Sequence, residues 1–186
     1  MAFHPLAYRM RPQNLDEIVG QQHLVGPGKI IRRMVDAKLL SSMILYGPPG
    51  TGKTSIASAI AGSTKYAFRK LNAATDSKKA LEQVVAEAKI SETVILMLDE
   101  IHRLTKPKQD FLLPHLESGQ IILIGATTEN PYIASNPAIR SRTQIFELKP
   151  LTAADIRQAL KRALHDEKNG LGSFNVSLDD AALDHL

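Results

Sequence analysis

The sequence predicts a doubly wound α/β domain, with helices on both faces of a parallel sheet, followed by a short all-helical segment. Three observations lead to this prediction. Short, almost wholly apolar runs alternate with segments of helical periodicity between residues 43 and 150. Such apolar runs are typical of strands buried on both faces, as in a parallel sheet. After Pro150, apolar residues recur only at helical spacing, which predicts that a second, smaller domain begins near residue 150.

Composition narrows the class of protein. A chain of 186 residues can hold one domain, or one domain and a fragment of a second. With 44% hydrophobic and 23% charged residues it should be a soluble, folded protein. The absence of cysteine excludes disulfides and thiolate metal sites, which fits a reducing cytosol. We see no signal peptide and no apolar run long enough to cross a membrane. The net charge of +4 permits contact with nucleic acid without indicating it.

Five strands and three helices are expected in the first domain, residues 1–150. The strands are predicted at Met43–Tyr46, Tyr66–Leu71, Thr93–Leu98, Ile121–Gly125 and Gln144–Leu148. The helices are predicted at 53–62, 76–90 and 105–117, with Pro114 as an irregularity in the third. Strands that alternate with helices in this way favour a five-stranded parallel sheet with right-handed crossovers.

The second domain, residues 151–186, is expected to be the truncated start of a helical unit. Thr152 and Asp155 have the spacing of a helix capping box, and an apolar stripe follows. Near the end of the chain, Ser177 or Asp179 is expected to begin another helix, and no stop signal follows it. We therefore expect a fragment of a longer protein.

The strongest motif follows the first predicted strand and precedes the first long helix. It satisfies the phosphate-loop pattern G-x-x-x-x-G-K-[ST]. Glycines let backbone N–H groups surround phosphate oxygens, and the amino end of the helix adds further donors. Lys53 should contact the β- and γ-phosphates of ATP, and the hydroxyl of Thr54 should bind Mg²⁺. The nucleotide-binding residues are Gly47, Pro48, Pro49, Gly50, Thr51, Gly52, Lys53 and Thr54.

Polar residues end two other predicted strands. Asp99 and Glu100 follow the third strand, at the sheet edge that carries the phosphate loop. Asp99 should hold Mg²⁺, and Glu100 should orient and deprotonate the attacking water. Thr128, after the fourth strand, is the better candidate to detect the γ-phosphate, although this segment could also simply turn the chain. His102 is interpreted as a local hydrogen-bonding residue, since the six histidines lack zinc-type spacing.

Taken together, these motifs resemble an AAA+ P-loop ATPase of the clamp-loader group, and most closely the RarA/MgsA family of replication-associated recombination proteins. The resemblance covers nearly the whole chain. It rests on "PLAYRMRPQNLDEIVGQQHLVGPG", "LYGPPGTGKTSIA", "DEIHRLTKPKQDFLLPHLESG", "LIGATTENPY" and "PLTAADI".

The resemblance implies further roles for single residues. Thr128 matches the sensor-1 position, and Asn72 matches the residue that holds the catalytic glutamate inactive until DNA binds. Here that would be a hydrogen bond between Asn72 and Glu100. The residues at the adenine-packing positions are Pro12, Ile18 and Val19, although Ile18 and Val19 could also be plain core residues. A second sensor, an arginine of the lid, is expected just beyond Leu186.

Two arginines before the last strand, Arg140 and Arg142, are expected to act on a neighbouring copy of the chain. In a parallel sheet they precede the amino end of a strand, whereas the phosphate loop follows a carboxyl end, about 17 Å away. The pair Ser141-Arg142 matches the arginine-finger position of the family. Arg142 is therefore the first candidate for a catalytic cation supplied in trans, and Arg140 the second. An intrachain salt bridge is the simpler alternative.

The function these observations favour is a DNA-dependent, Mg-ATP-hydrolysing ATPase in replication-fork maintenance, recombination and repair. The resemblance implies a homo-oligomer, tetrameric at full length, in the bacterial cytoplasm at the nucleoid. Its partners would be forked, gapped or junction DNA and single-strand-binding protein. Alternatives are a Holliday-junction branch-migration motor, a clamp-loader subunit, a nucleotide-gated binding module with negligible hydrolysis and, as an outsider, a small-molecule kinase. Lys106 and Lys108, which follow the acid motif, are candidates for contact with a phosphate backbone, and the alternative is that they are ordinary surface lysines.

Overall fold

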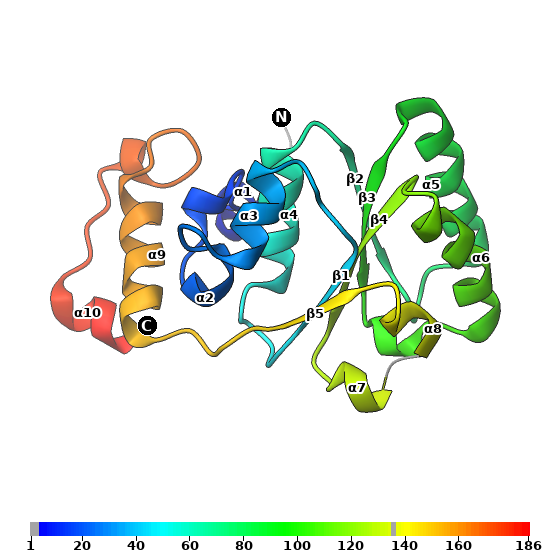
Figure 1. The fold of residues 1–186 in the computed structure, drawn as a ribbon. Coiled ribbons are helices and arrows are strands. Elements are labelled where there is room, and N and C mark those ends of the chain that lie inside the picture. The colour runs from blue at the N-terminus through cyan, green and yellow to red at the C-terminus, as the bar shows by residue number, and fades with distance from the viewer. Residues whose placement is uncertain (1–3, 135–136) are drawn as a thin grey trace.

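A five-stranded sheet with helices on both faces forms the body of the molecule (Figure 1). The computed structural model describes residues 4–134 and 137–186. The strands are β1 (Met43–Tyr46), β2 (Ala67–Asn72), β3 (Val94–Asp99), β4 (Ile121–Thr127) and β5 (Gln144–Glu147). The main helices around them are α3 (Ile30–Asp36), α4 (Lys53–Ser63), α5 (Lys78–Ser91) and α6 (Lys106–Glu117). The predicted fold class is therefore confirmed.

The sheet has the strand order β2-β3-β4-β1-β5, and every neighbouring pair is parallel. Strand β1 lies between β4 and β5, with Met43 opposite both Ile124 and Gln144. Three strands run farther than predicted, and one of them is β2, which ends at Asn72 rather than at Leu71. Strand β3 continues to Asp99 and β4 to Thr127, because backbone pairing with the neighbouring strands extends past the last apolar residue of each. The polar ends of these strands therefore belong to the rigid sheet.

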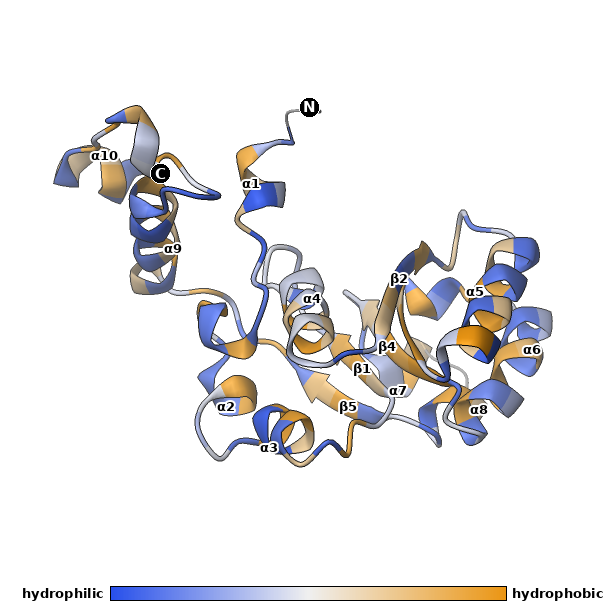
Figure 2. Ribbon diagram, turned by 90° about the horizontal axis from the view of Figure 1, so that it is seen from above, coloured by the Kyte–Doolittle hydropathy of each residue, from blue (hydrophilic) through white to orange (hydrophobic). Residues whose placement is uncertain are grey.

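Side-chain alternation along the strands divides the core into two layers. Met43 and Leu45 pack with α3, α4 and the amino-terminal segment, whereas Ile44 packs with α5 and α6 on the other face. Figure 2 shows the apolar strands between these two groups of helices. Because both faces are covered, strands β3 and β4 are almost wholly apolar, as the sequence indicated.

Helix α6 contains the one predicted irregularity, Pro114. The helix continues through this residue to Glu117. A proline ring removes the hydrogen bond to the carbonyl four residues earlier, here that of Asp110. Asp110 is exposed, so water can solvate that carbonyl group. The helix is thus not interrupted by Pro114.

The amino-terminal segment lies against the sheet and the phosphate loop. It contains α1 (Leu6–Arg9), the 3-10 turn η1 (Leu15–Glu17) and α2 (Gln22–Val25). Gln21 precedes α2 in a left-handed conformation, with φ of 54°, and its side chain is buried. Its Nε2 donates to the carbonyls of Thr51 and Lys149 at 2.9 and 2.7 Å, and its Oε1 accepts from Lys149 N at 2.9 Å. One carboxamide thus joins three segments that are far apart in sequence.

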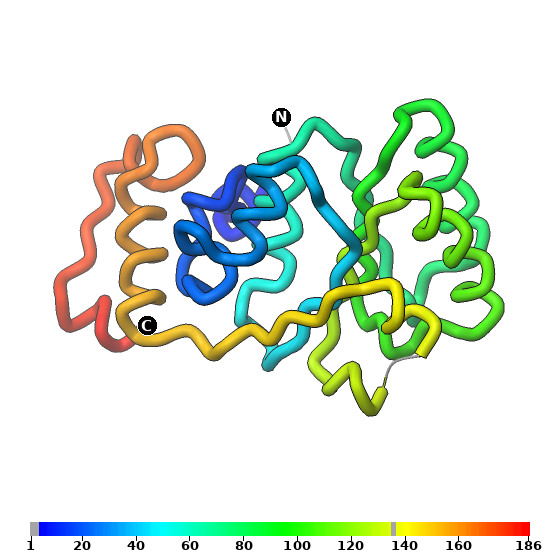
Figure 3. The backbone as a smooth tube through the Cα atoms, viewed as in Figure 1, coloured from blue at the N-terminus to red at the C-terminus, as the bar shows by residue number. Residues whose placement is uncertain are grey.

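After β5 the chain runs past the amino-terminal helices to α9 (Ala153–His165), as the tube in Figure 3 shows. The capping box predicted at Thr152 is present, since Thr152 Oγ1 accepts from Asp155 N and Asp155 Oδ2 accepts from Thr152 N. The 3-10 turn η3 (Gly172–Phe174) and α10 (Asp180–His185) follow, and Asp179 caps α10. Their assignment to a lid domain stays a prediction. In the described part of the chain no helix is both long and apolar enough to cross a bilayer.

Gln21→Ala should lower the free energy of unfolding by about 1–3 kcal/mol, because it removes the hydrogen-bond partner of the buried Thr51 carbonyl and two hydrogen bonds to the backbone of Lys149. Thermal or denaturant unfolding followed by circular dichroism measures the change. The side chain of the adjacent Gln22 is exposed and, among the described residues, hydrogen-bonds Gly20 O alone, at 3.3 Å, so Gln22→Ala is the matched control. Equal stability of the two variants would show that the Gln21 contacts contribute nothing.

Candidate functional site

The phosphate loop, Gly47 to Thr54, connects the carboxyl end of β1 to the first residues of α4. Gly50 and Gly52 adopt positive φ angles of 76° and 97°, which side chains with a Cβ rarely reach. Gly47 allows close backbone contact, since a Cβ there would lie 2.7 Å from the carbonyl oxygen of Leu148. The hydroxyl of buried Thr51 donates to Pro48 O at 2.8 Å. The loop is thus held in a curve above the amino end of an eleven-residue helix, where backbone N–H groups attract anions.

Lys53, the first residue of α4, folds back over this loop. Its Nζ donates to the carbonyls of Gly47 and Pro48 at 2.8 and 2.9 Å. Burial lowers the pKa of Lys53, and the carboxylate of Asp99 opposes that shift. A cation whose charged form is disfavoured by desolvation gains from an added anion, so the environment of Lys53 favours phosphate.

The two acidic residues lie at the end of β3 and just after it. Asp99 Oδ1 accepts a hydrogen bond from the backbone N–H of Glu100 at 2.9 Å. Glu100 has a left-handed backbone, with φ of 50°, and precedes the 3-10 turn η2 (Ile101–Arg103). This sharp turn directs the half-exposed Glu100 carboxylate towards Arg103, whose Nε lies 3.9 Å from Glu100 Oε2. The two carboxylates therefore occupy different positions, one in the strand and one in the turn.

A cavity of about 790 Å³ collects most of the predicted site residues. A volume of this size suits a small-molecule or cofactor ligand. The predicted residues in its wall are Pro12, Ile18, Val19, Pro49, Gly50, Thr51, Gly52, Lys53, Thr54, Asp99, Glu100 and Thr128. Gly47 and Pro48 are not in the wall, but they bind Lys53 as described above. The phosphate loop, two carboxylates and an apolar side therefore line the same cavity.

Four neighbours of the acid motif and of Thr128 also line the cavity: His102, Arg103, Thr127 and Glu129. His102 Nδ1 lies 2.9 Å from Thr127 Oγ1, and that oxygen accepts from Glu129 N at 3.0 Å. The interpretation of His102 as a local hydrogen-bonding residue is confirmed. Thr127 is 2% exposed, whereas Thr128 is exposed, so of the two only Thr128 faces outward from the sheet edge.

Helix α9 supplies a cation that sequence reasoning did not identify. Arg162 lines the cavity, and its guanidinium bonds the carbonyl oxygens of Glu17 and Met10 at 2.6 and 3.3 Å. It also pairs with the carboxylate of Glu17 at 3.2 Å. Nothing in the sequence pattern singles out Arg162, because its position depends on α9 returning to the amino-terminal segment.

Asn72 lies outside the cavity wall, at the end of β2 and opposite Asp99 in the sheet. The side-chain Oδ1 of Asn72 accepts from Ala74 N at 2.8 Å, and the backbone N–H of Asn72 donates to Asp76 Oδ2 at 2.7 Å. Among the hydrogen bonds of the described residues, none joins Asn72 to Glu100. The proposed restraint of Glu100 by Asn72 therefore stays a prediction.

Arg140 and Arg142 lie at the opposite edge of the sheet from the phosphate loop, as the parallel geometry required. Arg140, the last residue of α8 (Pro137–Arg140), donates to Tyr132 O at 2.6 Å. Tyr132 belongs to α7 (Pro131–Ala134). Arg142 pairs with Glu117 at 2.7 Å, and both side chains are about half exposed. The simpler alternative, an intrachain salt bridge, is thus present in this single chain.

The lysines after the acid motif are engaged within the chain. Lys106 Nζ lies 3.1 Å from Asp110 Oδ2, and Lys108 Nζ donates to Asp76 O at 2.8 Å. Lys106 is largely exposed, and exposed pairs of this kind contribute little stability. These contacts support the interpretation of both residues as ordinary surface lysines.

A magnesium ion with its nucleotide fits the donors in the cavity. The hydroxyl of Thr54 and the carboxylate of Asp99 are oxygen donors, which Mg²⁺ prefers, and both lie in the cavity wall. No group of three or more His, Asp or Glu in the described ranges could hold a metal ion by itself. Magnesium usually binds through one or two protein oxygens together with phosphate and water, so this small donor set is compatible with it.

Sequence comparison finds relatives over almost the whole chain. Replication-associated recombination protein A of Bacillus subtilis is 71% identical over 98% of this chain. The protein of the same name from Escherichia coli K12 is 43% identical over 96% of it. The chain spans only 43% and 41% of these two relatives. The resemblance stated from the motifs is thus confirmed over this length.

Structural comparison and the family model agree on the fold. A solved structure of RuvB from Thermotoga maritima, a variant of that protein, matches 95% of this chain and 58% of its own, with a TM-score of 0.75 and 28% identity. Another structure of that protein, described as a Holliday junction branch migration motor, matches with a TM-score of 0.71 and 27% identity. Residues 43–151, which contain the sheet and the phosphate loop, match the model of the ATPase family associated with various cellular activities. The chain therefore belongs to this family, the AAA ATPases.

Proposed function

We propose that this chain forms the ATP-hydrolysing part of a DNA-dependent ATPase that acts in replication-fork maintenance, recombination and DNA repair. The observation that carries the proposal is the single cavity bordered by Lys53, Thr54, Asp99 and Glu100. The chemistry of these groups matches the hydrolysis of Mg-ATP. The names of the bacterial relatives support a role in replication-associated recombination.

Each residue has a distinct task in this reaction. Lys53 and the backbone N–H groups of the phosphate loop bind the phosphates, and Thr54 with Asp99 holds Mg²⁺. Mg-ATP, when bound, supplies the phosphoryl group that is transferred to water. Glu100 orients the attacking water and accepts its proton, while Thr128 contacts the γ-phosphate. The apolar side, formed by Pro12, Ile18 and Val19, receives the adenine ring.

The complete protein is proposed to work as an oligomer on DNA. Arg142 would stabilise the transition state in a neighbouring copy, since it lies too far from the phosphate loop of its own chain. We extend the proposal to a tetramer in the bacterial cytoplasm, associated with the nucleoid, with single-strand-binding protein and forked or gapped DNA as partners. Residues 151–186 would begin the lid of the nucleotide site.

A Holliday-junction branch-migration motor is the second candidate. Its support is the fold similarity to RuvB, with TM-scores of 0.71 to 0.75. The much higher identity to relatives of another name, 71% and 43%, favours the first proposal. A clamp-loader subunit and a nucleotide-gated module without hydrolysis have no specific observation in their favour.

Phosphate release by the complete protein should rise when forked DNA is added, because the proposal makes hydrolysis DNA-dependent. The measurement compares forked, single-stranded and double-stranded DNA with no DNA. Lys53→Ala, which removes the phosphate-binding cation, is the negative control and should abolish both nucleotide binding and turnover. Turnover that no DNA alters would contradict DNA dependence, whereas a four-way junction as the strongest activator would favour the second candidate.

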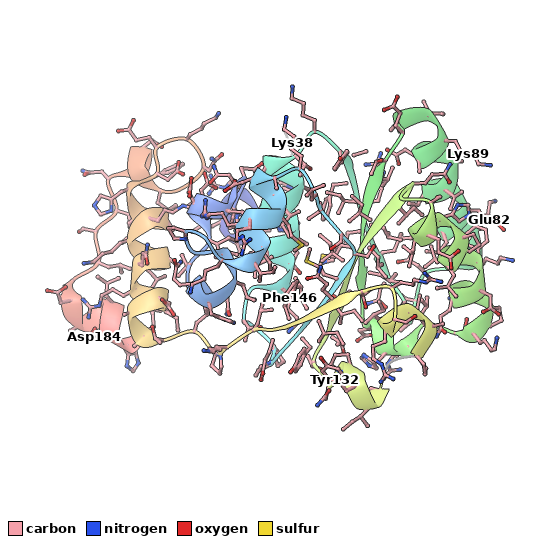
Figure 4. All side chains as sticks on the ribbon, viewed as in Figure 1. Lys38, Glu82, Lys89, Tyr132, Phe146 and Asp184 are labelled. Atoms are coloured by element: carbon pink, nitrogen blue, oxygen red, sulfur yellow. The ribbon has the colours of Figure 1, made fainter. Side chains whose placement is uncertain are left out.

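Glu100→Gln should keep ATP affinity but lower kcat by at least about a hundredfold, the usual contribution of a general base. Equilibrium binding of a fluorescent ATP analogue and steady-state phosphate release separate the two effects. The control is Glu82→Gln on α5, which Figure 4 shows pointing away from the sheet. Near-normal turnover in Glu100→Gln would exclude Glu100 as the base.

Arg142→Ala should leave ATP binding intact and lower kcat in the assembled protein by roughly 10³- to 10⁵-fold, the contribution of an arginine finger. The measurement is phosphate release at protein concentrations at which the oligomer persists. Glu117→Gln breaks the same intrachain pair without removing the arginine, so it is the matched control. Equal losses in both variants would assign Arg142 to the salt bridge rather than to catalysis in trans.

A further inference from the structure

The turn that carries Glu100 is fixed to strand β4 by two contacts. Ile101 is buried against Gly125, where a Cβ would collide with the Ile101 side chain. His102 Nδ1 lies 2.9 Å from the hydroxyl of Thr127, two residues further along β4. The first contact is apolar packing, and the second is a directed polar bond. Together they set the distance and orientation of η2 relative to the end of β4.

These contacts act on a strained position. Glu100 is a non-glycine residue in the left-handed region, with φ of 50° and ψ of 44°, a conformation that persists only where the surroundings hold it. The residues directly after Glu100 are the ones bound to β4. The His102–Thr127 contact therefore helps to fix the backbone that aims the Glu100 carboxylate.

The polar contacts around His102 form a closed set of three residues. Thr127 Oγ1 accepts from Glu129 N at 3.0 Å, which leaves its hydroxyl hydrogen free to be donated to His102 Nδ1. His102 Nε2 faces Glu129 Oε1 at 3.6 Å, so a ring proton is best placed on Nε2. The imidazole side chain is 14% exposed and thus largely shielded from water.

This set of contacts connects the two strand ends that carry the proposed chemistry. On one side lies the turn of Glu100, and on the other lies the loop of Thr128 and Glu129. A displacement of that loop moves Thr127 Oγ1 or Glu129 N, both of which are bonded within the set. The position of Glu100 consequently depends on the conformation of the segment that faces the phosphates.

We propose that His102 is a positioning residue for ATP hydrolysis, which through its Nδ1 bond to Thr127 locks the turn of Glu100 to the Thr128 loop. The inference rests on the proposed ATPase function. It assigns to His102 no contact with nucleotide or water. A purely structural histidine would affect stability and nucleotide binding together, whereas a positioning residue affects turnover at unchanged nucleotide affinity.

The test uses paired substitutions in the complete protein. Thr127→Val keeps the shape of the side chain and removes the hydroxyl, and His102→Gln keeps a polar group only near the Nε2 position. Each should lower kcat by roughly 10- to 100-fold, the effect of misplacing a catalytic group by up to about 1 Å. Nucleotide affinity should stay close to wild type, and both variants should remain folded at the assay temperature. The double variant should be no worse than Thr127→Val alone, because that substitution already breaks the bond to His102 and in addition removes the acceptor of the Glu129 N–H.

Conservative substitutions provide the rescue. His102→Asn places an acceptor near the Nδ1 position and Thr127→Ser retains the hydroxyl, so both should recover most of the turnover. Nitrogen-15 NMR of the histidine rings should show the Nε2–H form at His102 in the wild type and a shifted Nδ1 resonance in Thr127→Val. His115, which bonds Gln120 at 3.1 Å outside the cavity, is the control, and His115→Asn should behave as wild type.

Three results would overturn the inference. The first is wild-type kcat in both Thr127→Val and His102→Gln. The second is a fall in nucleotide affinity, or in the fraction of folded protein, that is large enough to account for the whole fall in turnover. The third is additive effects on kcat in the double variant. If Lys53→Ala is inactive while these variants are fully active, only the role of His102 is wrong and the ATPase proposal stands. A wild-type protein without turnover would overturn both.

Discussion

The parallel pairing of β1 with β4 and β5 is the constraint on which the rest of the molecule depends. It places the carboxyl ends of β1, β3 and β4 at one edge of the sheet, and each of these ends carries a polar segment. The phosphate loop, the two acidic residues and the threonine loop therefore meet without any direct interaction being required to collect them. The same pairing puts Arg142, which precedes β5, at the far edge of the sheet, away from its own phosphate loop.

The cavity is completed by segments whose placement the sheet does not decide. The carboxamide of Gln21 holds the amino-terminal segment to the phosphate loop and to the chain after β5. Arg162 on α9 also bonds this amino-terminal segment, at the carbonyl oxygens of Glu17 and Met10. Since all of these groups border or support one cavity, a ligand there would contact the sheet, the amino-terminal segment and α9 together. Movement of α9 would alter the wall of the site directly.

The ionisable groups of the site differ in how far they are buried and in which charges lie beside them. Burial lowers the pKa of Lys53 while Asp99 opposes the shift, which leaves a cation that gains from further negative charge. Glu100 differs from Lys53, because its carboxylate is half exposed and its direction is set by a strained backbone turn. Binding and hydrolysis thus make separate demands on the fold: a desolvated cation in a rigid loop, and a carboxylate whose backbone is held by β4.

The five strands, the phosphate loop and the acidic strand end could be predicted from the amino-acid sequence, because continuous apolar runs and a glycine-rich motif are local patterns. The sequence also indicated the capping box at Thr152 and the position of Arg142 away from the site. Other contacts were seen only in the folded chain: Gln21 and Arg162 support the cavity, Arg142 pairs with Glu117, and His102 bonds Thr127. These contacts join residues between 25 and 145 positions apart. Their partners are chosen by the packing of whole elements, for which a single sequence has no local pattern.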